Sequence, residues 1–107
     1  MTVYANNSYA AKNVGNTATQ IFSVSSGTAA IASMIVTNTT VSPITTTVYI
    51  TRSAVNYNLV YQATVPVGGS LEVIQGSRVV MVASDALYVI NSAATSADVW
   101  VSALTAV

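Results

Sequence analysis

The stretch ITTTVYITRSAVNYNLVYQATV, residues Ile44–Val65, decides the fold of this chain. From Ile44 to Arg52, apolar side chains alternate with threonine and tyrosine, which is the period of a strand with one buried face. A second alternating run covers Tyr57–Val65, and the short segment between the two runs predicts a loop. β-Branched residues are frequent in both runs and disfavour a helix by restricting χ1. The stretch therefore predicts an antiparallel hairpin whose buried face carries Ile44, Val48 and Ile50.

Similar segments continue on both sides of this hairpin. Short apolar or alternating runs, each ended by a turn cluster, recur about every 8–12 residues, a spacing typical of sandwiches and barrels. They predict further strands at residues 18–24, 28–38, 70–74, 79–82, 86–91 and 97–104. About eight short antiparallel strands fit two packed sheets of roughly four strands each. We therefore expect a single all-β, two-sheet sandwich, jelly-roll or immunoglobulin-like, over residues 17–107.

The first 16 residues differ in composition from the rest of the chain. They are rich in Asn, Ala and Tyr and show weak hydrophobic patterning, so we expect an extended N-terminal arm over residues 1–16. Tyr4 and Tyr9 lie in this arm, with no local core to bury them. They either belong to a flexible exposed segment or anchor the arm on a neighbouring subunit, because aromatic residues are enriched at protein interfaces.

Charged side chains are few. The 107 residues include three basic and three acidic ones, and the net charge is zero, whereas about a quarter of the residues of an ordinary domain are charged. Serine, threonine and asparagine supply the polarity instead. Such a surface suits a protein packed against other subunits; the alternative is a neutral monomer solubilised by hydroxyls and amides. Three scattered basic residues neutralise few phosphates, so we expect no nucleic-acid partner.

The side chains that carry most enzyme chemistry are missing. The sequence has no histidine and no cysteine, which excludes Ser–His–Asp and Cys–His centres, thiolate metal sites and disulfides. Each of the three acids has a structural interpretation: Asp85 and Asp98 accept backbone N–H bonds at turns, and Glu72 faces solvent or pairs with Arg52 or Arg78. We therefore expect no enzyme, cofactor or metal site. Because no apolar run approaches the roughly 20 residues of a membrane helix, we expect no membrane partner.

Aromatic side chains remain as candidates for binding. Tyr49, Tyr57 and Tyr61 lie in the predicted hairpin, where they are placed to form a protein interface or a carbohydrate-binding surface. Trp100 is expected in the core or as a plug on a strand face. The candidate interface residues are Tyr4, Tyr9, Tyr49, Tyr57 and Tyr61.

Residues 28–104 carry an ordered series of turn-and-strand motifs. A strand ending in Thr-Asn precedes a Thr/Val hairpin, followed by a Val-Pro-x-Gly-x-Ser-Leu turn, a Gly-x-x-apolar strand, an Asp-x-Leu-x-Val segment and a last strand after Asp-Val. The matching stretches are Val36–Asn38, Val65–Leu71, Gly76–Val80, Asp85–Val89 and Asp98–Val101. In this order they resemble a family of small β-sandwich accessory virion proteins of tailed bacteriophages. One departure is Ser84, which stands where glycine would precede Asp85 and changes the expected turn.

The resemblance implies a structural role and supplies no catalytic residue. The first expectation is a head decoration, or cement, protein, assembled in the host cytoplasm, that binds between major capsid subunits of the virion and stabilises the head, as a homotrimer. A second expectation is a subunit of the tail, neck, baseplate or fibre attachment, in contact with other virion proteins. The alternative from another class is a β-sandwich module that binds a glycan or receptor through Tyr49, Tyr57 and Tyr61.

Overall fold

A computed structural model describes residues 4–74 and 78–106 of the chain, and their regular structure is entirely β. The strands are β1 (Tyr4–Val14), β2 (Thr19–Ser23), β3 (Thr28–Asn38), β4 (Ile44–Arg52), β5 (Val55–Val65), β6 (Ser70–Ile74), β7 (Val79–Val82), β8 (Ala86–Asn91) and β9 (Ala97–Ala106). The expected all-β class and two-sheet sandwich are confirmed, and each of the eight expected strands is present. In the described part of the chain, no helix is long and apolar enough to span a membrane.

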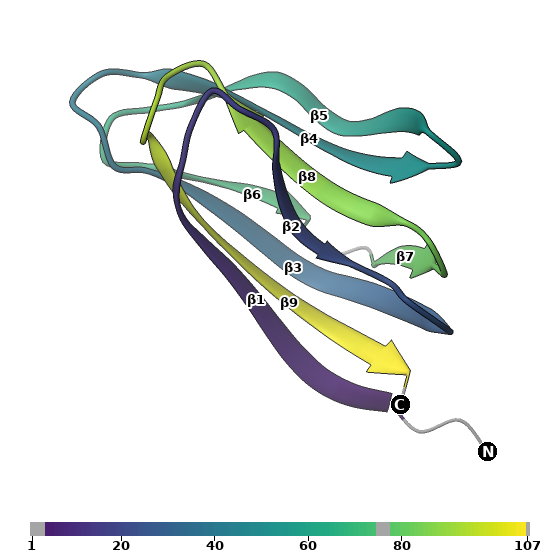
Figure 1. Cartoon of the computed structure of the whole chain (residues 1–107). Coiled ribbons are helices and arrows are strands. Elements are labelled where there is room, and N and C mark those ends of the chain that lie inside the picture. The colour runs from purple at the N-terminus through teal and green to yellow at the C-terminus, as the bar shows by residue number, and fades with distance from the viewer. Residues whose placement is uncertain (1–3, 75–77, 107) are drawn as a thin grey trace.

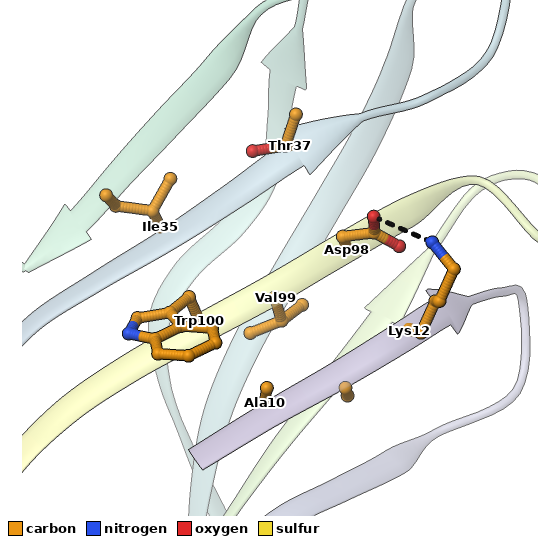
Figure 2. A pocket seen from close by; sticks show the side chains of 8 residues that line it. Ala10, Lys12, Ile35, Thr37, Asp98, Val99 and Trp100 are labelled. Atoms are coloured by element: carbon orange, nitrogen blue, oxygen red, sulfur yellow. Dashed lines mark hydrogen bonds and ion pairs between the residues drawn. The ribbon is translucent and has the colours of Figure 1, made fainter. Parts of the chain in front are cut away.

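The strands form two antiparallel sheets that face each other (Figure 1). The larger sheet has the order β1-β9-β3-β6, with β7 also paired to β3 beyond the end of β6. The smaller sheet has the order β2-β8-β4-β5. Strand alternation gives the larger sheet an outward face that includes Ala10, Ile35 and Trp100 in one cross-strand row (Figure 2).

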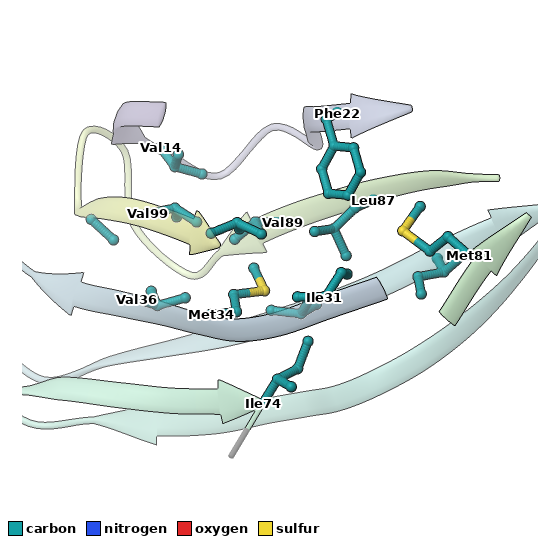
Figure 3. Packing of buried hydrophobic residues seen from close by; sticks show 14 of the residues in the cluster. Val14, Phe22, Ile31, Met34, Val36, Ile74, Met81, Leu87, Val89 and Val99 are labelled. Carbon is teal, nitrogen blue, oxygen red and sulfur yellow. The ribbon is translucent and has the colours of Figure 1, made fainter. Parts of the chain in front are cut away.

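The inward faces of both sheets supply one hydrophobic core (Figure 3). Met34, Val36 and Val101 of the larger sheet are fully buried, as are Val48 and Leu87 of the smaller one. These residues occupy every second position of their strands, which is the alternation that the sequence displays. The core therefore fixes which side chains point outward.

Residues 4–14, which belong to the expected N-terminal arm, form the edge strand β1. Its backbone pairs with β9 from Tyr4 opposite Ala106 to Val14 opposite Ala97. Val14 is buried in the core, so this part of the N-terminal segment belongs to the sandwich, and the expected boundary at residue 16 is corrected. Residues 1–3 of the expected arm lie outside the described residues.

The decisive hairpin is confirmed, with one correction to its pattern. Ile44, Val48 and Ile50 are buried, as expected. Along β5, however, the register shifts twice: Tyr49 is opposite Asn58 while Val48 is opposite Val60, and a second shift follows before Ala63. These bulges break the strict alternation that the sequence predicts over 57–65, because each extra residue reverses the phase of the side chains that follow it.

Candidate binding surfaces

A pocket of about 480 Å³ opens on the outward face of the larger sheet, beside Trp100. Trp100 projects from β9 and remains 54% exposed. Its cross-strand neighbours are Ile35 on β3 and Ala10 on β1, and Figure 2 shows the three side chains rising from adjacent strands. Because Ala10 is small, the space over β1 beside the indole is left open. We call this space, with Lys12, Thr37 and Asp98 at its end, the Trp100 pocket.

A β-bulge arranges the polar end of the Trp100 pocket. Between Ala11 and Val14 the β1 register gains one residue relative to β9, and Asn13 adopts the left-handed conformation with φ 57°. The N–H of Asn13 donates to Asp98 Oδ1 at 3.1 Å. Lys12 Nζ lies 3.4 Å from Asp98 Oδ2, with the two side chains 77% and 39% exposed. The bulge thus holds a carboxylate and an ammonium group side by side at the pocket rim (Figure 2).

The exposure of Trp100 differs from the first of its two expected placements, a core position. The alternation in β9 places Val99 and Val101 on the opposite face from Trp100, and both valines are buried. The alternation of apolar residues in this strand therefore indicates from the sequence that Trp100 faces outward.

A second surface follows the free edge strand β5. Val55, Tyr57 and Tyr61 are 50%, 57% and 66% exposed. The chain carries no charged residue from Ser53 to Leu71, a stretch that includes all of β5. We call these three side chains the β5 edge surface.

The three hairpin tyrosines do not form one platform. Tyr57 is paired with Ile50, so its side chain lies on the same, inward side of the sheet as that of Ile50. Tyr49 points outward. The ring of Tyr49 stacks on Tyr88, with centroids 5.3 Å apart. Tyr61 follows Val60, which is opposite the buried Val48, and therefore points to the outward side. Tyr57 and Tyr61 thus lie on the two sides of the same edge strand.

The two tyrosines of the N-terminal segment have different positions. Tyr9 points into the sandwich and stacks on Phe22, with ring centroids 4.3 Å apart. Its aromatic contact is therefore within its own chain, which corrects the view that no local core can hold it. The side chain of Tyr4 lies outside the described part of the structure.

Arg52 and Asp85 form an ion pair that joins the end of β4 to the turn before β8. Arg52 Nε and Nη2 donate to the two carboxylate oxygens of Asp85 at 2.9 and 2.6 Å. Asp85 is 1% exposed and also accepts the N–H of Val82. The hydrogen bond from Arg52 is the main cause that lowers the pKa of Asp85. The expected turn role of Asp85 is confirmed, and its partner shows that Arg52 pairs with this acid.

The described residues contain no group of three or more histidine, cysteine, aspartate or glutamate side chains placed to hold a metal ion. Two ion pairs, Lys12 with Asp98 and Arg52 with Asp85, each join an acid to a base. No family model, curated protein or solved structure matches the chain.

Proposed function

We propose that the chain is a structural subunit of a virion, a head decoration protein that binds between major capsid subunits and assembles as a homotrimer. Its contact surface is the β5 edge surface, Val55, Tyr57 and Tyr61. The observation that carries the proposal is the exposure of these three side chains within a stretch of 19 residues, 53–71, that has no charge. The centres of protein interfaces are depleted in charged residues and enriched in tyrosine.

The distribution of charge supports the same function. Four of the six charged residues are paired with each other, Lys12 with Asp98 and Arg52 with Asp85. A pair of opposite charges at short distance has a weak field beyond its immediate surroundings, so long-range attraction to a charged partner is small. Recognition then depends on shape and on contacts of apolar groups and tyrosine hydroxyls.

The bulges of β5 define the kind of contact. An edge strand that is long and uncharged is prone to pair with strands of other molecules, and bulges oppose this by twisting the edge. In β5 the register shifts twice, and Gln62 adopts a φ of 49° while its N–H donates to Thr47 Oγ1. A neighbouring subunit therefore contacts the β5 edge from both sides, at Tyr57 on one side and Tyr61 on the other, and does not extend the sheet.

Light scattering and sedimentation of the purified chain test this surface. We expect the wild-type protein to have a mass three times the 11.0 kDa of one chain. The double variant Tyr57→Ser/Tyr61→Ser should associate more weakly. The concentration at which half of its oligomer dissociates should be at least about tenfold higher than for the wild type, because exposed aromatic anchors carry much of an interface's free energy. Val41→Ser is the matched control, since Val41 is 92% exposed and lies in the loop before β4. Equal masses for wild type and double variant at every concentration would contradict the assignment.

A position in the tail, neck, baseplate or fibre attachment would use the same surface with a different neighbour. Antibody labelling of intact particles separates these positions, because label over the head surface and label at the tail are distinct in electron micrographs. We expect label over the head. Label confined to the tail would retain the structural role and overturn its assignment to the capsid.

A further inference from the structure

The Trp100 pocket combines an aromatic side with a small cluster of polar groups, and it lies on the sheet that does not contain the β5 edge surface. We propose that this pocket binds a neutral saccharide, with one sugar ring lying against the indole of Trp100. This activity goes beyond the structural role proposed above and does not depend on it.

The indole side of the pocket suits the apolar face of a sugar ring. A pyranose presents C–H groups on its faces and hydroxyls around its edge, so it needs a flat apolar surface with polar groups beside it. Trp100 supplies the flat surface and is 54% exposed, with Ile35 next to it in the cross-strand row. Ala10, on the other side, is too small to cover the indole. The volume of about 480 Å³ falls in the range of small-molecule pockets, roughly 300–1,000 Å³.

The rim of the pocket supplies donors and acceptors for hydroxyl groups. Asp98 is held by the N–H of Asn13 at Oδ1, and its Oδ2 lies 3.4 Å from Lys12 Nζ. This last distance is long for a charge-assisted hydrogen bond, which is about 2.7–2.9 Å, so both groups retain capacity for a ligand. Two neighbouring hydroxyls of one ring can then donate to Asp98 and accept from Lys12. The hydroxyl of Thr37 lies at the same end (Figure 2).

The charges at the rim indicate a neutral ligand. Lys12 and Asp98 have opposite signs and are adjacent, so an anionic sugar that approaches Lys12 also meets the carboxylate. A cationic ligand that approaches Asp98 likewise meets the ammonium group of Lys12. A purely aliphatic ligand would use the indole and leave the rim without a role. A neutral polyhydroxylated ring is the ligand class that uses both parts of the pocket.

Fluorescence is a direct probe, because Trp100 is the only tryptophan of the chain. The protein is titrated with neutral tetrasaccharides of glucose, galactose and N-acetylglucosamine, and with sialylated and sulfated oligosaccharides for comparison. We expect at least one neutral tetrasaccharide to shift or quench the emission with a dissociation constant in the submillimolar to millimolar range. The charged oligosaccharides should bind more weakly.

Variants assign the binding to the pocket. By calorimetry, Trp100→Ala should weaken the affinity at least about tenfold, because an aromatic platform is lost. Lys12→Ala and Asp98→Asn should weaken it several-fold while circular dichroism and thermal unfolding confirm a folded protein. Tyr61→Ser, which changes the other sheet, is the matched control and should bind as the wild type does.

Four results would each overturn the proposal. They are an unchanged emission with every neutral tetrasaccharide at millimolar concentration, equal or tighter binding of the charged ones, unchanged affinity in Trp100→Ala, and an emission that changes with protein concentration alone. The last result would show that a second copy of the chain covers the pocket. None of the four involves the β5 edge surface, so failure here leaves the structural role to its own test.

Discussion

The guanidinium of Arg52 and the carboxylate of Asp85 meet through two hydrogen bonds of 2.9 and 2.6 Å, although 33 positions separate them in the sequence. The carboxylate is buried, whereas half of the arginine side chain is exposed. This contact fastens the tip of the β4–β5 hairpin to the turn between β7 and β8. At its far end, the hairpin that presents the β5 edge surface is therefore joined to the rest of the sandwich by this ion pair and by the β4–β8 ladder, which pairs Thr51 with Ala86.

The first prediction concerns acid stability. Because Arg52 lowers the pKa of Asp85 in the folded protein, the pair stabilises the fold fully above the ordinary aspartate pKa, and this contribution declines as the pH falls from there through the lowered value. The thermal unfolding midpoint should be constant from neutral pH down to the ordinary aspartate pKa, and it should decrease at lower pH. Arg52→Gln removes the main cause of the lowered pKa of Asp85, so the variant should be less stable than the wild type near neutral pH, and its unfolding midpoint should decrease less over the same acid range. An unchanged pH profile in this variant would show that the pair does not determine acid stability.

The second prediction concerns the core. Val89 is fully buried, and Val89→Ala should lower the free energy of unfolding by about 2–3 kcal/mol, from two lost methyl groups and the cavity that remains. The same change at Val41, which is 92% exposed, should have an effect within about 0.5 kcal/mol. Urea denaturation followed by circular dichroism measures both values. Similar losses in the two variants would argue against the burial described for β8.

The third prediction concerns Ser84, which stands where the motif of the resembling virion proteins would have glycine before Asp85. Ser84 has a φ of 77°, which is a left-handed conformation that glycine adopts without strain. Ser84→Gly should therefore raise stability by about 0.5–1 kcal/mol, the relief of strain exceeding the entropy gained by the unfolded chain. Gly68→Ala is the opposite case: its φ is 66° with no atom within 4 Å of an added Cβ, so it should lose about 1 kcal/mol through strain alone. Thermal unfolding of both variants provides the check, and a destabilised Ser84→Gly protein would exclude strain at this turn.

The fourth prediction concerns Asn38, whose buried side chain connects two loops. Its amide nitrogen lies 2.9–3.2 Å from the carbonyl oxygens of Ser42, Val65 and Pro66, and its oxygen accepts the N–H of Thr40. Asn38→Ala should cost about 1–3 kcal/mol, because buried partners lose their hydrogen bonds.

Asn58→Ala is the control for this change, since Asn58 is exposed on β5, and it should be close to neutral. Amide hydrogen exchange should also speed up in Asn38→Ala, in the loop before β4 and in the turn after β5. Unaltered exchange there, together with unaltered stability, would refute the connecting role of Asn38.

The sequence predicts the strands well where one face is strongly apolar. In β4 the alternation of buried apolar residues with outward-facing threonine and tyrosine determines both the strand and its orientation. β1 is different: among its described side chains, Tyr9, Ala11 and Val14 pack at the core, and Asn and Ser occupy many of the other positions. Its strand conformation comes from backbone pairing with β9, which no local pattern reveals.

The candidate sites are less accessible from the sequence. A single extra residue near Leu59 moves Tyr57 and Tyr61 to different sides of β5, and such bulges leave no clear mark in an uncharged strand. The Trp100 pocket requires three strands, β1, β3 and β9, that are far apart in the chain. Only the outward direction of Trp100 follows from the valines on either side of it.

Competitive incorporation into particles tests the central claim, that neighbouring virion subunits bind the β5 edge surface. Virions assembled without the chain are mixed with equal amounts of the wild type and Tyr57→Ser/Tyr61→Ser, purified by sedimentation, and the bound ratio is measured by mass spectrometry. We predict that the wild type is retained in a fixed ratio to the major capsid protein while the double variant stays in the supernatant. Equal retention of both proteins, or retention of neither, would contradict the proposed surface and its structural role.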